Sequence, residues 1–351
     1  MWFVSDNAAP VAPEVMAALV RANAGHAGSY GGDEATARVV ARLREIFEAP
    51  AAAVFLVGTG TSANALALAC LCPPWATVYC HRNAHIEEDE CGAPEFYTGG
   101  AKLTLLDGAH GRIDAAALEQ AIAFTARAGV HNVQRGALSL TNSTELGAVY
   151  SPDAVARLAG LARARGLPVH MDGARFANAL VSLGCTPAEL TWKAGVDVLC
   201  LGGTKNGLMG VEAVIFFDPA RAWEFELRRK RGGHLFSKHR YLAVQMEAWL
   251  SDGLWLELAS RANARAAALA AGIAALPGAR LDHPAEANAV FAAFPRAGHR
   301  ALQAAGARYY LWPGHQSLEG PGEVPLSARL VCDWSTEATE VEALLAVLAR
   351  A

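Results

Sequence analysis

Short apolar segments of strand length alternate along the chain with longer segments in which apolar residues recur at helical spacing. Clusters of glycine, proline and asparagine separate these segments. Such alternation predicts a largely parallel sheet that helices cover on both faces. The expected strands are residues 54–57, 77–80, 102–106, 138–141, 169–171, 196–201 and 211–217.

The helical segments lie between these strands, and the pattern changes after residue 255. The first helices are expected near residues 14–24, 34–47, 62–71 and 85–90, and later ones at 114–128, 152–166 and 241–255. A long alanine-rich helix then starts near residue 260, followed by strands at 289–294, 308–311 and 327–332 and a helix at 336–350. We therefore expect an N-terminal arm over residues 1–34, a large domain over 35–255 and a smaller α+β domain over 256–351.

Composition narrows the class of protein further. The 351 residues are 53% hydrophobic and 18% charged, which is typical of a globular protein. The net charge of −4 gives the protein no overall positive charge that would attract nucleic acid. The opening MWFVSDNAAP lacks the features of a signal peptide, and no apolar stretch is long enough to cross a membrane. Most of the seven cysteines lie in apolar runs, as expected of reduced thiols. We expect a cytoplasmic protein.

Polar groups follow several of the expected strands. They are the loop GTGTSAN at 58–64, His81 and His85, Asn142, Asp172, and the pair Thr204 and Lys205. The carboxyl ends of parallel strands meet at one edge of a sheet, where ligands bind. These groups are therefore predicted to form one site.

Lys205 follows the strand at 196–201 and two glycines. Desolvation at such a position lowers the pKa of a lysine and favours its neutral, nucleophilic amine. That form suits a Schiff-base lysine. An ordinary solvent-facing lysine in a turn is the alternative. The other groups at this edge favour the first interpretation.

The loop at 58–64 begins a helix, so its backbone N–H groups form an anion site. It also matches the dinucleotide pattern G-x-G-x-x-A. That pattern expects an acidic residue about 20 positions later, where this chain has Cys80, His81 and Arg82. Arg82 leaves NADP open as an alternative, and a simple helix-capping turn is a third interpretation.

Asp172 is a candidate partner for a cationic ring nitrogen, with Arg175 three residues further on. A structural ion pair is the alternative. His85 is a candidate for stacking on a ring. No metal site is expected, because Cys80, His81, His85 and Cys91 lack the usual ligand spacing.

Lys205 lies 33 residues after Asp172, and further segments share their order with a known family. The chain resembles the low-specificity L-threonine aldolases of the β-eliminating lyase family, which are pyridoxal-phosphate enzymes of fold type I. The resemblance covers almost the whole chain. Its segments are SDNAAPVAPEVMAAL, SYGGDE, GTGTSANALAL, HIEEDECGAPEF, HMDGARFANAL, GGTKNGLMG, RRKRGGHLFSKHRYLAVQ and SARLVCDW.

The resemblance implies how the cofactor is held. Lys205 would bond to it as an aldimine, Asp172 would hold the ring nitrogen, and His85 would stack on the ring. The remaining contacts would be Gly60, Thr61 and Thr204 at the phosphate, Arg175 near the ring hydroxyl, and Lys230 or Arg231 at the phosphate of a neighbouring subunit.

The resemblance also implies substrate contacts. Ser5 and Arg329 would bind the amino-acid carboxylate, with Arg175 and Tyr30 nearby. His131, eleven residues before Asn142, would lie near the substrate hydroxyl together with Glu90. Asn142 is followed by STELG, which departs from the family pattern and bears on recognition of that hydroxyl.

The implied fold is a mainly parallel seven-stranded sheet in a large domain, with a smaller C-terminal α+β domain. The implied activity is a lyase reaction that cleaves L-threonine or L-allo-threonine, and other β-hydroxy-α-amino acids, to glycine and an aldehyde. A homo-oligomer with shared sites, a dimer of dimers, is expected. The alternatives are another β-eliminating lyase or aminotransferase of the same fold, an NADP-dependent oxidoreductase, and a homologue without catalysis.

Overall fold

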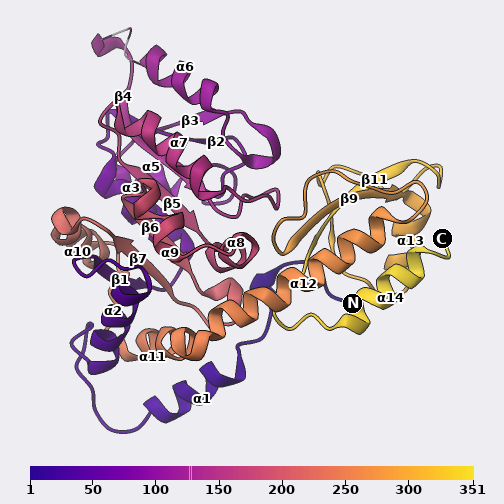
Figure 1. Cartoon of the computed structure of the whole chain (residues 1–351), viewed down its shortest axis with the longest axis horizontal. Coiled ribbons are helices and arrows are strands. Elements are labelled where there is room, and N and C mark those ends of the chain that lie inside the picture. The colour runs from indigo at the N-terminus through magenta and orange to yellow at the C-terminus, as the bar shows by residue number, and fades with distance from the viewer. Residues whose placement is uncertain (126, 128) are drawn as a thin grey trace.

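The computed structural model describes residues 1–125, 127 and 129–351 (Figure 1). Within these residues, one sheet has seven strands in the order β1-β7-β6-β5-β4-β2-β3, and a second has four in the order β10-β11-β9-β8. The strands of the large sheet are β1 (Ala53–Val57), β2 (Ala76–His81), β3 (Lys102–Leu106), β4 (Gln134–Thr141), β5 (Val169–Gly173), β6 (Val198–Gly202) and β7 (Glu212–Phe216). Those of the small sheet are β8 (Arg280–Leu281), β9 (Ala289–Pro295), β10 (Tyr310–Leu311) and β11 (Pro325–Val331).

Helices connect the strands of the large sheet and cover it. They are α1 (Pro13–Ala22), α2 (Glu34–Ile46), α3 (Gly60–Leu71), α4 (His85–Glu88), α5 (Ala93–Thr98), α6 (Ala115–Thr125), α7 (Pro152–Arg163), α8 (Phe176–Leu183), α9 (Pro187–Leu190), α10 (Ala222–Arg231) and α11 (Arg240–Leu250). The pairs of neighbours from β3 to β6 are parallel, and only β7 runs antiparallel to its neighbours β1 and β6. The predicted α/β class and the mainly parallel seven-stranded sheet are confirmed.

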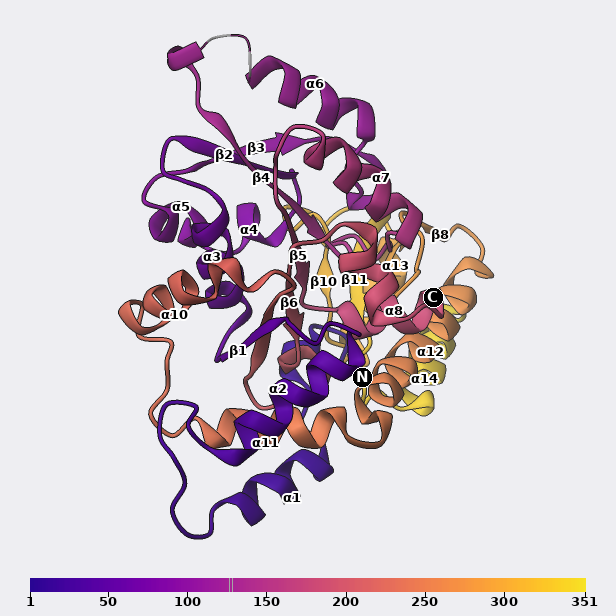
Figure 2. The same ribbon diagram turned by 60° about the vertical axis from the view of Figure 1, so that its left-hand side comes forward.

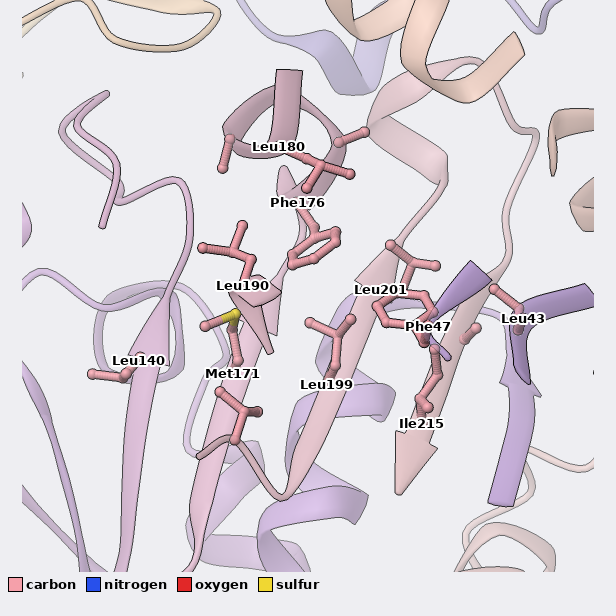
Figure 3. Close-up of a cluster of buried hydrophobic side chains, with 14 of the residues drawn as sticks. Leu43, Phe47, Leu140, Met171, Phe176, Leu180, Leu190, Leu199, Leu201 and Ile215 are labelled. Atoms are coloured by element: carbon pink, nitrogen blue, oxygen red, sulfur yellow. The ribbon is translucent and has the colours of Figure 1, made fainter. Parts of the chain in front are cut away.

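Successive residues of the buried strands supply two different cores, because side chains alternate between the two faces of a sheet. Leu199 and Leu201 of β6 pack with α2, α8 and α9 on one face (Figure 3). Val198 and Cys200 of the same strand point to the other face, where α3 and α10 cover the sheet (Figure 2). Each fully buried leucine contributes about 2 kcal/mol through loss of apolar contact with water. Asp172 of β5, described below, lies on the face that α3 covers, because it accepts a hydrogen bond from Asn64 of that helix.

The small sheet packs with α12 (Leu254–Ala274), α13 (Arg296–Ala304) and α14 (Ala338–Leu348) (Figure 1). The first residues of the chain join this part of the molecule. Phe3 is fully buried in its core, and Trp2 forms a bridge with Arg308. The domain boundaries given above stay predictions.

Three predicted elements differ from the structure. The helix predicted at 241–255 ends at Leu250, because the backbone at Asp252 and Gly253 is left-handed, with φ of 52° and 73°. The long helix therefore starts at Leu254 instead of near residue 260. The strand predicted at 308–311 is reduced to the two residues of β10. The predicted end of α6 at Ala128 lies outside the described residues.

None of the described helices combines the length and the apolar composition that crossing a bilayer requires. The described residues also include no cluster of three or more histidine, cysteine, aspartate or glutamate side chains arranged to hold a metal ion.

Candidate active site

A cavity of about 240 Å³ lies at the carboxyl ends of β1, β5 and β6 and at the amino end of α3. This is where the strand order and the parallel direction place the ends of the strands. Six predicted residues line it: Gly60, Thr61, His85, Asp172, Thr204 and Lys205.

The position of Lys205 depends on the two glycines before it. A Cβ atom at Gly202 would lie 2.5 Å from the carbonyl oxygen of Ala174, and one at Gly203 would lie 2.8 Å from that of Val211. Only glycine, which has no Cβ atom, fits at these two positions, where the chain turns sharply after β6. Lys205 then enters the cavity from a short 3-10 turn, η5 (Thr204–Asn206). Among the described residues, its amine has no hydrogen-bond partner or ion pair.

Asp172 lies near the end of β5 and is buried beneath the cavity. One carboxylate oxygen accepts a hydrogen bond from the backbone N–H of Ala174 at 3.0 Å, and the other accepts one from the side-chain amide of Asn64 at 3.0 Å. These two bonds fix the carboxylate without neutralising it. It can therefore hold a cationic N–H in the cavity.

His85 begins α4, and its Nδ1 lies 2.8 Å from Oε1 of the buried Glu90. The hydrogen bond to Glu90 raises the pKa of His85 against the opposing effect of burial, and the charge of Asp172 acts in the same direction. Burial raises the pKa of Glu90. Asn64 donates to Glu90 at 2.9 Å as well as to Asp172. The Nε2 atom of His85 has no partner among the described residues and is available for proton transfer.

The amino end of α3 provides a site for an anion. Thr59 caps the helix by accepting a hydrogen bond from the backbone N–H of Ser62 at 3.2 Å. The N–H groups of Gly60 and Thr61 belong to the first turn, which has no partners within the helix. Next to Gly60 the space is open, since a Cβ atom there would meet nothing within 4 Å. This end of the cavity fits a phosphate group.

Arg175 is held mainly by the N-terminal arm. Its Nε and Nη2 donate to Asp6 at 2.7 and 2.9 Å, while Nη1 lies 3.9 Å from Glu145. Burial favours the neutral acid, but the charges of Arg175 and Lys205 outweigh this effect and lower the pKa of Asp6 to about 2. Only one edge of the Arg175 guanidinium is thus left for a ring hydroxyl or a substrate.

Arg329 lies on β11 of the small sheet, and the charges of the Arg175 group act on its guanidinium. Burial lowers the pKa of Arg329, and the charge of Arg175 lowers it further, whereas Asp6 and Glu145 raise it. Arg329 is half-buried and has no hydrogen bond or ion pair with any described residue. A free, partly desolvated guanidinium is well suited to binding a carboxylate in a bidentate manner.

The structure does not bring His131 to the site, and the prediction for this residue is wrong for the single chain. His131 is exposed and lies just before β4, whereas the cavity lies beyond the carboxyl ends of the strands. The eight residues of β4 separate the two ends by about 25 Å.

Four other predicted residues lie outside the cavity lining. Lys230 lies with its Nζ 4.5 Å from the ring centre of Tyr30, and Arg231 follows it at the end of α10. Ser5 caps the short turn at Asp6–Ala8, where it accepts a hydrogen bond from the backbone N–H of Asn7. Asn7 itself lines the cavity, so the arm that carries Ser5 is close to it.

Four residues of the site were missed by the sequence reasoning. They are Asp6, Asn64, Glu145 and Glu212, of which Asn64 and Glu212 line the cavity. For Glu212, the signal in the sequence was a single charged residue at the start of the apolar strand VEAVIFF. For Asn64, it was an amide near the start of a helix that begins at a glycine-rich loop. The dinucleotide alternative has no support, because Arg82 forms an exposed ion pair with Asp107.

The described cavity fits pyridoxal phosphate. A lysine amine, a buried carboxylate and an anion-binding helix end surround one space, and they match the aldehyde, the ring nitrogen and the phosphate of that molecule. His85 lies on the wall of the same space.

Known proteins agree with this arrangement. Residues 3–295 match the model of the beta-eliminating lyase family. The low specificity L-threonine aldolase of a Pseudomonas species is 42% identical over 98% of this chain and 96% of its own, and that of Pseudomonas aeruginosa is 44% identical over 97% and 95%. Threonine aldolase from Leishmania major has a TM-score of 0.91 at 28% identity, covering 99% of this chain and 98% of that one.

A serine palmitoyltransferase from Sphingomonas wittichii shares the fold, with a TM-score of 0.72 at 14% identity over 100% of this chain and 86% of its own. A structure described as SPT with PLP as an internal aldimine likewise shares the fold, with a TM-score of 0.71 at 16% identity over 100% of this chain and 86% of its own. The family match, the identity with aldolases over nearly the full length and the geometry of the cavity lead to one conclusion. The chain belongs to the β-eliminating lyase family of fold type I, pyridoxal-phosphate-dependent enzymes, together with the low-specificity L-threonine aldolases.

Proposed function

We propose that this protein is a low-specificity L-threonine aldolase. It cleaves L-threonine, L-allo-threonine and other β-hydroxy-α-amino acids to glycine and an aldehyde. The observation that carries the proposal is the meeting of Lys205, Asp172 and His85 in one cavity. The relatives named above support the choice of reaction within the family.

In this proposal, Lys205 bonds to the cofactor, Asp172 holds the ring nitrogen, and the first turn of α3 holds the phosphate through Gly60 and Thr61. When bound, pyridoxal phosphate supplies an electron-withdrawing ring that takes up the electron pair left on Cα. The buried carboxylate of Asp172 keeps a proton on the ring nitrogen, because a nearby negative charge favours the cationic form.

Arg329 binds the substrate carboxylate and so fixes the amino acid in the site. His85 then accepts the proton of the β-hydroxyl at Nε2, directly or through one water molecule. The Cα–Cβ bond breaks, the aldehyde leaves, and a proton returned to Cα completes glycine. Glu90 supports this step because its hydrogen bond at Nδ1 raises the pKa of His85 and orients the ring.

We also propose that the active site is shared in a homo-oligomer, a dimer of dimers. Lys205 is the only lysine or arginine among the described residues that line the cavity, which is little positive charge for a phosphate dianion. Lys230 and Arg231 lie on α10 without contact with this cavity, so in a second copy they are free to approach its phosphate.

Mixed subunits test this sharing. A Lys205→Ala variant and a Lys230→Ala, Arg231→Ala variant, each with little activity, should regain up to about a quarter of the activity when they form mixed dimers with one intact site. Mixtures that exchange subunits but stay inactive would show that each site is built from one chain.

The activity itself is tested with purified protein, pyridoxal phosphate and L-threonine. We expect glycine and acetaldehyde in equal amounts, without ammonia or a 2-oxo acid, which are the products of elimination and transamination. The protein should show a visible absorbance band that borohydride removes, and the Lys205→Ala variant should lose both the band and the reaction. A wild-type protein that binds pyridoxal phosphate but releases ammonia would instead be a β-eliminating enzyme.

A further inference from the structure

Glu212 is a buried carboxylate to which the proposed mechanism gives no role. It begins β7 and lies opposite Val57 of β1 and Gly202 of β6 in the register of the sheet. Because β7 is antiparallel, its first residue lies at the edge where β1 and β6 end. Glu212 is therefore placed between the anion-binding loop after β1 and the turn that carries Lys205, and it lines the cavity with both.

Both hydrogen bonds to the carboxylate of Glu212 come from the residues directly before Lys205. One oxygen accepts a hydrogen bond from the backbone N–H of Gly203 at 2.7 Å, and the other accepts one from Oγ1 of Thr204 at 2.5 Å. A threonine hydroxyl has a single hydrogen. While Glu212 is ionised, that hydrogen is used, and Thr204 offers only lone pairs to the rest of the cavity.

This arrangement conflicts with a bound phosphate. Thr204, Glu212 and the first turn of α3 line the same cavity, and Glu212 lies opposite Val57, directly before the loop that begins α3. A phosphate dianion accepts hydrogen bonds and repels a carboxylate, and both effects are strong in a site with little water. An ionised Glu212 therefore both repels the phosphate and keeps the Thr204 hydroxyl from donating to it.

Few charges act on Glu212 from the elements around it. Lys205 faces it from the turn, β1 contributes no titratable side chain, α3 contributes only Cys70, and β6 contributes Cys200. Burial raises the pKa of Glu212 to about 7, against the opposing effects of its hydrogen bonds and of Lys205. Beyond Cys200 lie Asp172 and Glu90, which add negative charge to this part of the protein. Glu212 is thus able to take up a proton near neutral pH.

We propose that Glu212 takes up one proton from solvent when the phosphate of pyridoxal phosphate binds, so that Thr204 turns its hydroxyl hydrogen from Glu212 to the phosphate. The protonated carboxyl group then donates to Oγ1 of Thr204, which donates in turn to a phosphate oxygen. No covalent bond forms or breaks apart from the O–H bond of the added proton. Glu212 acts as a positioning residue through Thr204, and the inference rests on the proposed binding of this cofactor.

The test compares the affinity of wild type and Glu212→Gln for the cofactor. The glutamine amide can donate to Thr204 and accept from Gly203 at any pH, so it imitates the protonated carboxyl group. The dissociation constant of pyridoxal phosphate is measured by equilibrium dialysis of the holoenzyme between about pH 6 and about pH 9. We expect the ratio of wild-type to Glu212→Gln dissociation constants to rise by about 10- to 100-fold over this range.

Two controls separate this effect from other titrations. Pyridoxal, which has no phosphate, should give a ratio that stays constant with pH. Glu87→Gln removes an exposed carboxylate outside the cavity lining, without contact with Thr204, and should keep the pH dependence of wild type. If Glu212→Gln does not fold, the wild type alone still provides a test. Its preference for pyridoxal phosphate over pyridoxal should fall as the pH rises, although ionisation of the phosphate alone favours the opposite trend.

A ratio that does not change with pH would overturn the inference and leave cofactor binding intact. A ratio that changes equally for pyridoxal would also overturn it, because the phosphate would then have no part in the effect. If wild type binds neither ligand at Lys205, with no absorbance band, the proposed function fails instead.

Discussion

Replacement of Glu90 by glutamine tests whether His85 is the base. The glutamine Oε1 can still accept hydrogen bonds from His85 and from Asn64, which lie 2.8 and 2.9 Å from the carboxylate oxygen, so the geometry is kept and only the charge is lost. A hydrogen bond to a charged group contributes about 1.5–3 kcal/mol, and one pKa unit corresponds to about 1.4 kcal/mol. Glutamine keeps a neutral hydrogen bond, which contributes about 0.5–1.5 kcal/mol, so only the difference is lost and the pKa of His85 should fall.

The sign of the effect follows from the protonation state that the reaction needs. His85 accepts a proton only when it is neutral, so activity falls as the pH drops below its pKa. Once the Glu90 charge is removed, burial still lowers the pKa of His85 and is opposed mainly by the charge of Asp172. The acidic limb of the profile of kcat/KM against pH should move to lower pH by about one unit, which corresponds to a difference of about 1–1.5 kcal/mol. The maximal rate should fall roughly tenfold, because a weaker base accepts the proton less readily.

The assay is the rate of aldehyde release from L-threonine at saturating pyridoxal phosphate, followed across the pH range. Glu87→Gln, an exposed carboxylate on the same short helix, is the matched control and should keep the profile of wild type. An acidic limb that stays in place in Glu90→Gln would refute the assignment of His85 as the group that titrates.

Three further substitutions test other parts of the site. Arg329→Ala should raise KM for L-threonine by about 10- to 100-fold with little change in kcat, because the lost contact to the carboxylate is present in both the ground and transition states; a lower kcat at unchanged KM would contradict this role. Asp172→Ala should reduce kcat by at least about 100-fold in protein whose bound cofactor is verified by absorbance, because the ring nitrogen loses its proton. Asp6→Asn should lower the free energy of unfolding in urea by about 2 kcal/mol at neutral pH, since the pKa of Asp6 is about 2 in the folded chain against 3.8 normally. This contribution is complete above pH 3.8 and is lost as the pH falls through about 2, so the difference between Asp6→Asn and wild type should shrink in acid.

The positions of Asp172 and Lys205 were predictable because one rule determines them. Both follow buried parallel strands, and parallel strands end at the same edge. His131 had no such basis. Its role came only from the resemblance to the family, and the segment between it and Asn142 contains the whole of β4, which places His131 at the opposite edge of the sheet.

The same rule did not identify Glu212, because the strand that carries it runs in the opposite direction. The rule looks for polar residues after strands, whereas β7 is antiparallel and begins at the edge where the others end. The pairing of Asp6 with Arg175 also has no local signal, because 169 residues separate the two. Periodicity reports the elements and their faces, but contacts between distant segments depend on how those elements assemble.

The contacts of Asp6 also order the steps by which the protein becomes active. Asp6 is synthesised well before its partners, because it is held by Arg175, 169 residues further on, and accepts a further hydrogen bond from Asn288 at 3.0 Å. Phe3, three residues before Asp6, is buried in a core whose other residues come from roughly the last hundred residues of the sequence. A growing chain therefore cannot complete these contacts until Asn288 and the core that packs on Phe3 have been synthesised. Loss of Phe3 and Asp6 would remove the contacts that this segment makes with both the small sheet and Arg175, even if every strand of the large sheet folded correctly.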